Sequence, residues 1–202
     1  MKHILLFLAL PFFSFISFRE SADDFDKQLN DVAADFKTNI FEKAKCSAAS
    51  QKAGEISQSI KDLLDGGDIE KSEIKKLEGL KKEADALEDY ITAAGDLDGG
   101  FVTVENLNLA NARVNGNINT VSNGKFCVDV ISVSVGDFIC YLAENNDSKM
   151  TTVTYSWKGP AGAKSGSGTV QVFAKSVHPV YSNRDEPTVK EISFLAMTCK
   201  QK

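Results

Sequence analysis

The stretch Gly95-Asp-Leu-Asp-Gly-Gly100 divides the chain into two parts with different hydrophobic periods. Before it, apolar residues recur every three or four positions, as on one face of a helix. After it, apolar and polar residues alternate in short runs, as in antiparallel strands. The sequence therefore predicts an α+β protein. A helical hairpin of two or three helices is expected over residues 22–99, followed by an antiparallel β-sandwich or barrel-like domain over residues 100–202.

The first half of the helical part has two apolar faces that do not coincide. Their members are Phe25, Leu29, Val32, Phe36 and Ile40 on the first face, and Ala49, Ala53, Ile56, Ile60, Leu63 and Leu64 on the second. On one helical wheel the two faces differ by about 130°. We expect either a helix break within residues 44–50 or one helix with two packing partners. Gly66-Gly67 should end this helical stretch, as glycine does just past a helix C-terminus.

A further helix is expected after Asp68, which can cap its N-terminus. Its apolar residues alternate spacings of three and four, as in a short heptad seam: Leu77, Leu80, Ala84, Leu87, Ile91 and Ala94. The seam is too short for an independent coiled coil. It favours an antiparallel helical hairpin over an oligomerisation surface.

The part after residue 100 contains at least five short runs of alternating hydrophobicity. Their inward positions are Phe126, Val128 and Val130; Phe138, Cys140 and Leu142; Val153, Tyr155 and Trp157; Val170, Val172 and Ala174; and Ile192, Phe194 and Ala196. Long polar connectors separate several of these runs, notably residues 158–168 and 178–187. This pattern is typical of an antiparallel sandwich or barrel.

Residues 1–21 are predicted to be a signal peptide. An apolar run from Ile4 to Phe18 follows one positive charge. The run is shorter than the roughly 20 residues that span a bilayer, although an uncleaved anchor is the alternative reading. The residues near its end that are small enough to precede a cut are Ser17, Ser21 and Ala22. No later stretch reaches membrane-spanning length, so we expect a secreted, extracellular protein.

Secretion favours disulfide bridges among the four cysteines, Cys46, Cys127, Cys140 and Cys199. Three pairings are possible. Because Cys127 and Cys140 lie in neighbouring strand-like runs, a bridge between them is plausible, which would leave Cys46 to pair with Cys199. Asn146 begins the sequon Asn-Asp-Ser in a polar loop and is a candidate glycosylation site.

The glycine-rich boundary also has the spacing of a calcium-binding loop. With residue 94 as position 1, Asp96, Asp98 and Glu105 fall at ligand positions 3, 5 and 12. Together with a similar but poorer match from Asp62 to Glu73, this resembles an EF-hand pair. Such a resemblance implies oxygen ligation of calcium by these carboxylates. Ala94 supplies no ligand at position 1, so no metal site is favoured and no cofactor is expected.

Composition argues against most catalytic and nucleic-acid functions. The net charge is −5, whereas nucleic-acid binding usually requires a basic patch. His178 is the one histidine beyond the predicted leader, and Ser176, Ser182 and Asp185 would have to converge on it to form a triad. The loop from Gly159 to Gly168 joins two strand-like runs rather than opening a helix, as a phosphate-binding loop would. We expect no enzyme activity.

These observations predict a secreted, disulfide-stabilised, non-enzymatic binding protein that recognises an extracellular partner or ligand. The alternative is an extracellular carrier of lipids or small hydrophobic ligands, or a membrane-active protein of defence or toxin type. In that alternative, the amphipathic stretch Phe25–Ile40 would cover a cavity or lie on a bilayer. A packed β region favours the first function, and a hollow one favours a carrier.

Overall fold

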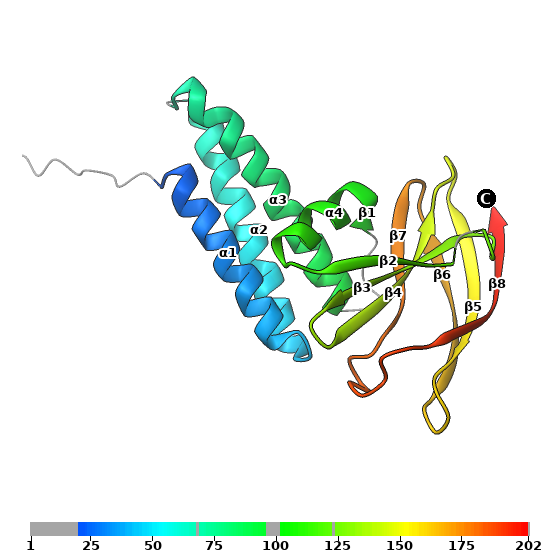
Figure 1. Cartoon of the computed structure of the whole chain (residues 1–202). Coiled ribbons are helices and arrows are strands. Elements are labelled where there is room, and N and C mark those ends of the chain that lie inside the picture. Colours follow the sequence, from blue (N-terminus) through cyan, green and yellow to red (C-terminus); the bar gives the residue numbers. More distant parts are fainter. Residues whose placement is uncertain (1–19, 68, 96–101, 123, 202) are drawn as a thin grey trace, which may run out of the picture.

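The computed structural model describes residues 20–67, 69–95, 102–122 and 124–201. Within these ranges the chain forms four helices and eight strands. The helices gather at one side of the molecule, and two antiparallel sheets occupy the other (Figure 1). The predicted mixture of N-terminal helices and later antiparallel strands is confirmed. The sheets do not close into a barrel.

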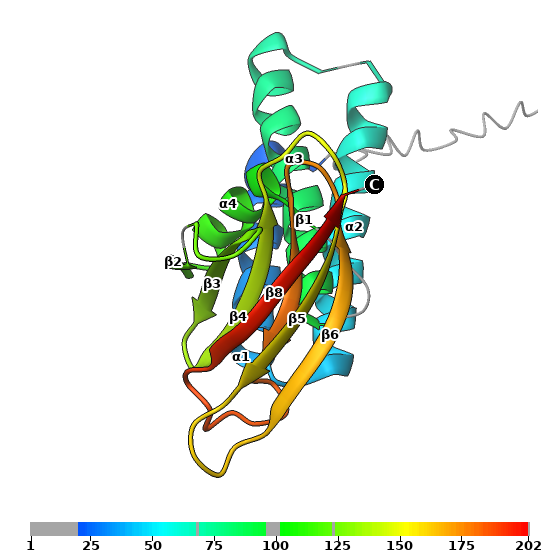
Figure 2. The same ribbon diagram turned by 90° about the vertical axis from the view of Figure 1, so that its right-hand side faces the viewer.

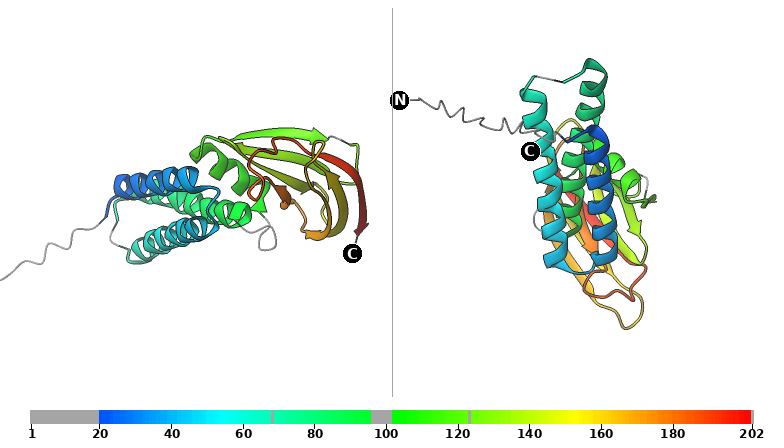
Figure 3. Two further views of the ribbon diagram at one scale, coloured as in Figure 1. Left: turned by 90° about the horizontal axis from the view of Figure 1, so that it is seen from below. Right: turned by 90° about the vertical axis from the view of Figure 1, so that its left-hand side faces the viewer.

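Three helices precede the boundary: α1 (Ala22–Asn39), α2 (Lys43–Asp65) and α3 (Lys71–Gly95). Every predicted apolar residue of α1 and of the α3 seam is buried, with no more than 7 % of its surface exposed. In two views α3 lies between α1 and α2 and extends furthest toward the sheets (Figure 3). The seam thus serves packing within the chain. As predicted, α2 ends just before the glycine pair: its last residue is Asp65, Gly66 is its C-cap, and Gly67 follows with a φ of 75°.

The break between the first two helices lies earlier than predicted, at Ile40–Glu42 rather than within residues 44–50. Phe41 leaves the helix to meet Phe138 edge-to-face, with ring centroids 5.8 Å apart. The Cys46 thiol lies 3.5 Å from the carbonyl oxygen of Ile40, one of the last carbonyls of α1. The chain therefore turns where an aromatic side chain can reach the sheet, and the small residues after it continue into α2.

A fourth helix, α4 (Val104–Arg113), lies where the sequence predicted strands only. It follows the two-residue strand β1 (Val102–Thr103), and the Thr103 hydroxyl caps it by accepting from the Asn106 backbone N–H at 3.1 Å. Leu107 and Ala110 are buried on its inner side. Three asparagines within ten residues give α4 a weak intrinsic helix propensity, so its packing against α3 decides its conformation.

The larger sheet has the strand order β1-β7-β4-β3-β2, and the smaller has the order β6-β5-β8 (Figure 2). The bounds of β1 are given above, and the remaining strands are β2 (Asn117–Ser122), β3 (Asp129–Val135), β4 (Phe138–Asn145), β5 (Thr151–Lys158), β6 (Ser165–Val172), β7 (Ser176–Ser182) and β8 (Ser193–Gln201). All ladders are antiparallel.

Strands β3, β4 and β7 of the larger sheet are buried on both faces, whereas the edge strand β2 is mostly exposed. On β4, Phe138, Cys140 and Leu142 belong to an apolar cluster shared with the helices. The intervening residues Tyr141 and Ala143 belong to a second cluster. The smaller sheet contributes to that second cluster through Val153, Val172, Phe194 and Met197. One sheet therefore separates two filled cores.

A bulge shifts the alternation of β8, so one predicted inward position is wrong. Trp157 is paired with Phe194, whereas Ser156 is paired with Ala196. Leu195 is the extra residue and is 57 % exposed. Beyond the bulge Met197 points inward and Ala196 is exposed, the reverse of the simple alternation.

Most of the predicted signal peptide lies outside the described residues. None of the helices that the structure describes is long and apolar enough to cross a membrane.

Candidate functional site

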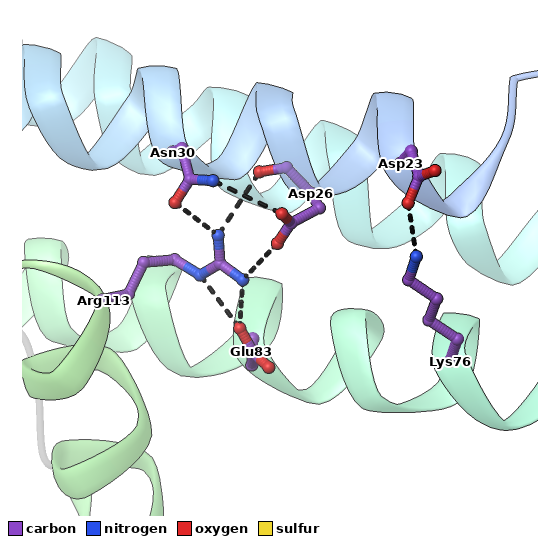
Figure 4. Close-up of polar contacts among 6 residues, drawn as sticks. All are labelled: Asp23, Asp26, Asn30, Lys76, Glu83 and Arg113. Atoms are coloured by element: carbon purple, nitrogen blue, oxygen red, sulfur yellow. Dashed lines mark hydrogen bonds and ion pairs between the residues drawn. The ribbon is translucent and has the colours of Figure 1, made fainter.

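The most densely bonded polar cluster surrounds Arg113, at the end of α4 (Figure 4). Its Nε donates to Glu83 of α3 at 2.9 Å, and Nη2 reaches both Glu83 and Asp26 of α1. Its Nη1 donates to the Asp26 carbonyl oxygen and to the Asn30 side chain. The five donors of the guanidinium are thus all engaged, and its side chain is only 10 % exposed. This cluster ties three helices together, and its guanidinium has no donor left for a ligand.

A second candidate lies at one end of the sheets, where two connections meet. The β5–β6 loop and the β7–β8 connection together line an open hollow of about 540 Å³, which includes Pro160 and Pro187. A neighbouring hollow of about 360 Å³ shares Pro160 and adds residues at the start of β8. An ion pair of 3.3 Å between Lys164 and Glu186 joins the two connections. We call this surface the loop end.

Buried asparagines fix the backbone around the loop end and at the opposite turns. Asn183, with no exposed surface, accepts from the Ile139 N–H at 2.8 Å and donates to the Asp137 carbonyl at 2.9 Å. Asn145 donates to the carbonyls of Lys149, Val172 and Phe173. Sequence reasoning missed both asparagines. A polar residue within or just after an apolar run was the available signal.

The β5–β6 loop is a hairpin connection, as predicted, rather than a phosphate-binding loop. Gly159 donates its N–H to the Lys164 carbonyl at 3.0 Å, and Gly162 adopts a φ of 90°. The loop joins two paired strands and opens no helix.

A third hollow of about 380 Å³ lies between α1 and α2. Its lining includes Gln28, Asp31, Lys52 and Ser59. Its lining is mixed in charge and only partly apolar, with Val32 and Ile56 as its apolar members.

A very small apolar cavity lies between α3 and the larger sheet. Its volume is about 10 Å³, and Tyr90, Phe138 and Cys140 are among its lining residues. The Tyr90 hydroxyl has no hydrogen-bond partner among the described residues, and burial raises its pKa. The space is sufficient for about one water molecule and not for a lipid chain.

The cysteine pairing expected from strand adjacency is wrong. Cys127 is bonded to Cys199, 72 residues away, and this bridge joins the segment before β3 to the end of β8. Cys46 and Cys140 are buried free thiols. Burial raises the pKa of Cys46 and raises that of Cys140 to about 12, which keeps both protonated and poorly reactive.

The calcium candidates can be placed only in part. Asp96 and Asp98 lie outside the described residues, and Glu105 is exposed in the first turn of α4. Among the described residues, no group of three histidine, cysteine or acidic side chains is arranged to hold a metal ion.

The histidine candidate for catalysis is not assembled with its partners. His178 lies on β7 with its Nδ1 2.8 Å from the Pro179 carbonyl oxygen. The Ser176 hydroxyl donates instead to the Phe173 carbonyl at 2.8 Å.

Asn146 is exposed in the connection between β4 and β5. Its Nδ2 lies 3.4 Å from an oxygen of Asp129, a long contact that leaves the amide accessible. Glycosylation there stays a prediction.

Two adjacent carboxylates on α3, those of Glu88 and Asp89, have raised pKa values. Burial raises the pKa of Glu88 and of Asp89, and neighbouring acidic groups raise both further. Asp89 accepts from the Asn106 side chain at 2.7 Å, which connects α3 to α4. Asp89 thus has a clear structural role.

Comparison with known proteins gives no relative for this chain: no family model, curated protein or solved structure matches it.

Proposed function

We propose that the protein is secreted, disulfide-stabilised and non-enzymatic, and that it binds an extracellular partner or ligand through the loop end. The observation that carries this proposal is the pair of open hollows formed by the β5–β6 and β7–β8 connections. Connections held on a rigid scaffold are the usual place for recognition surfaces. In this proposal the two sheets form a filled β-sandwich, because residues of both share one apolar cluster.

The carrier alternative has less support from the geometry. Pockets for small ligands usually measure about 300–1,000 Å³, far more than the small interior cavity. The apolar face of α1, which would have to contact a bilayer or a ligand, is packed against the other helices. Either activity would require the helices to separate from one another.

Partner capture with matched variants tests the proposal. Thr188 lines the loop end and Ser59 lines the α1–α2 hollow, and both are small, exposed hydroxyl residues. Purified wild type, Thr188→Arg and Ser59→Arg would each be immobilised and exposed to extracellular fluid from the source organism. Any retained partner would then be purified, and its Kd measured against each protein.

We expect Thr188→Arg to weaken binding by at least tenfold, since a large charged side chain would occupy the hollow, while Ser59→Arg binds like wild type. Equal binding by all three proteins would exclude the loop end. Co-purifying lipid, or flotation with liposomes, would favour the carrier instead.

A further inference from the structure

Strand β6 is an edge strand without the features that usually protect an exposed edge. Four strands lie at the ends of the two sheets: β1 and β2 in the larger, and β6 and β8 in the smaller (Figure 2). Short length, bulges and charged residues each discourage pairing at an edge. Strand β1 has two residues, β2 has a bulge between Thr120 and Ser122, and β8 has both a bulge and Lys200. By contrast, β6 has eight residues in unbroken register with β5, and none of them is charged or a proline.

The register of the β5–β6 hairpin shows which backbone groups of β6 face the open edge. At the turn, the Gly159 N–H donates to the carbonyl of Lys164 opposite it. Because bonded and non-bonded pairs alternate along an antiparallel ladder, every second residue from Gly166 onward bonds to β5. The N–H and carbonyl groups of the intervening residues therefore face outward: Ser165, Ser167, Thr169 and Gln171. No other strand in the described part of the chain pairs with this side of β6.

Two aromatic rings of β5 lie over the glycines of β6. Gly166 is paired with Trp157, and Gly168 is paired with Tyr155. A Cβ at Gly166 would lie 2.7 Å from the Trp157 ring, and one at Gly168 would lie 2.5 Å from the Tyr155 hydroxyl oxygen. The rings thus occupy the space that larger β6 side chains would need, and both are half-buried. Apolar side chains on the same face of a further strand would extend this aromatic layer.

The smaller sheet and its hairpin loop differ in charge from the rest of the chain. Residues 151–172 and 193–201 contain three lysines and no acidic residue, although the whole chain has a net charge of −5. The lysines, Lys158, Lys164 and Lys200, are all exposed, and Lys164 keeps 71 % of its side chain exposed beside Glu186. Two copies paired through β6 would bring like charges together, whereas an acidic segment would be attracted. Charge therefore favours an acidic partner over a second copy.

We propose that β6 binds an extended, acidic segment of a partner protein, which adds to the smaller sheet as a further strand. The outward groups of β6 bond the backbone of the segment, as in other strand-addition complexes. The aromatic layer contacts apolar side chains at alternate positions of the segment. Its acidic side chains lie on the opposite, outer face, which also carries Lys158 and Lys200. This surface is separate from the hollows of the loop end, so the inference does not depend on binding there.

Synthetic peptides test the inference on the full chain. The probe is acetyl-Glu-Val-Glu-Val-Thr-Val-Glu-Val-amide. One control peptide replaces each glutamate by lysine, and the other carries N-methyl groups on the glutamate and threonine residues, whose N–H groups would bond β6. Titration followed by Trp157 fluorescence should give the probe a Kd at least about tenfold below that of either control. No binding of the probe at roughly 1 mM, or equal binding of a control, would overturn the inference.

Two variants at one position locate the binding. Thr169→Pro removes an outward N–H but keeps the ladder to β5, as proline does on an edge strand. Thr169→Ala keeps that N–H and removes only the hydroxyl. We expect Thr169→Pro to weaken binding at least about tenfold and Thr169→Ala to bind like wild type. Unchanged binding by folded Thr169→Pro would overturn the inference, and if this variant fails to fold, the N-methylated peptide tests the same bonds on wild type.

Sedimentation of the unliganded protein checks the other occupant. We expect a monomer, since like charges oppose pairing of two β6 edges. A wild-type dimer that Thr169→Pro dissociates would overturn the inference, because the occupant would then be a second copy of the chain.

Discussion

Removing the bridge between Cys127 and Cys199 should cost this protein a large part of its stability. The bonded residues are 72 positions apart, and β3 to β7 with most of β8 lie between them. The chain-entropy relation for a loop of that size gives about 4 kcal/mol at 25 °C. Measured bridges often deliver less than this, so we expect the double variant Cys127→Ala, Cys199→Ala to lose about 3–4 kcal/mol.

Urea unfolding followed by tryptophan fluorescence is a suitable assay. Trp157 is the only tryptophan in the chain, and its ring lies 4.4 Å from that of Tyr181, on the larger sheet. Its emission should therefore report separation of the two sheets. Wild type in a thiol reductant should match the double variant, and the double variant should not respond to the reductant.

Two results would refute this reasoning. A loss below about 1 kcal/mol would mean that the bridge constrains the unfolded chain far less than its length implies. A response of the double variant to reductant would mean that Cys46 and Cys140 are also oxidised, contrary to their state in the structure.

Three smaller perturbations test the contacts that hold the elements together. Arg113→Lys should lower the free energy of unfolding by about 2 kcal/mol, because an ammonium group cannot replace the fork of bonds to α1 and α3. Thermal unfolding measures this loss of stability, and an unchanged midpoint temperature would contradict the prediction. Gly168→Ala should destabilise the smaller sheet, because its new Cβ would lie 2.5 Å from the Tyr155 hydroxyl oxygen. The near-ultraviolet circular dichroism spectrum should change with it. An unaltered spectrum and unaltered stability would show that the Tyr155 ring moves freely out of the way. Hydrogen bonds from Ser21 lower the pKa of Asp24 below 3.8, so the stabilising effect of its carboxylate is present near neutrality and is lost as the pH falls. The stability difference between wild type and Asp24→Asn should therefore shrink between about pH 5 and pH 2. A difference that stays constant over this range would contradict the prediction.

Hydrophobic period predicted the helices well because each helix buries one continuous stripe. The α3 seam from Leu77 to Ala94 is buried, and α2 ends at Gly66-Gly67 as expected. The same method failed at α4, where the residues that pack are few and asparagines dilute the pattern. It also failed beyond Leu195, because a bulge reverses the alternation and leaves no mark in the composition.

The cysteine pairing could not be predicted for a different reason: it depends on the three-dimensional arrangement of the strands rather than on their hydrophobic period. Cys140 points toward the helices, whereas Cys199 belongs to the smaller sheet on the other side of the larger one. Adjacent strands in sequence order therefore do not bring their cysteines together. The face on which each cysteine lies decides the pairing, and that face depends on which core the strand borders.

Neither the shape of the loop end nor the contacts that hold it in place could be predicted from the pattern of apolar residues. Asn183 holds the start of the β7–β8 connection against the turn before β4. The bulge in β8 sets where that connection joins the smaller sheet. A buried amide without its partners would be costly, so such a residue fixes one backbone path among many of equal apolar content. A connection fixed in this way loses little further entropy when it binds a partner. The same asparagine that sequence periodicity overlooks therefore fixes the backbone on which the recognition proposed for the loop end depends.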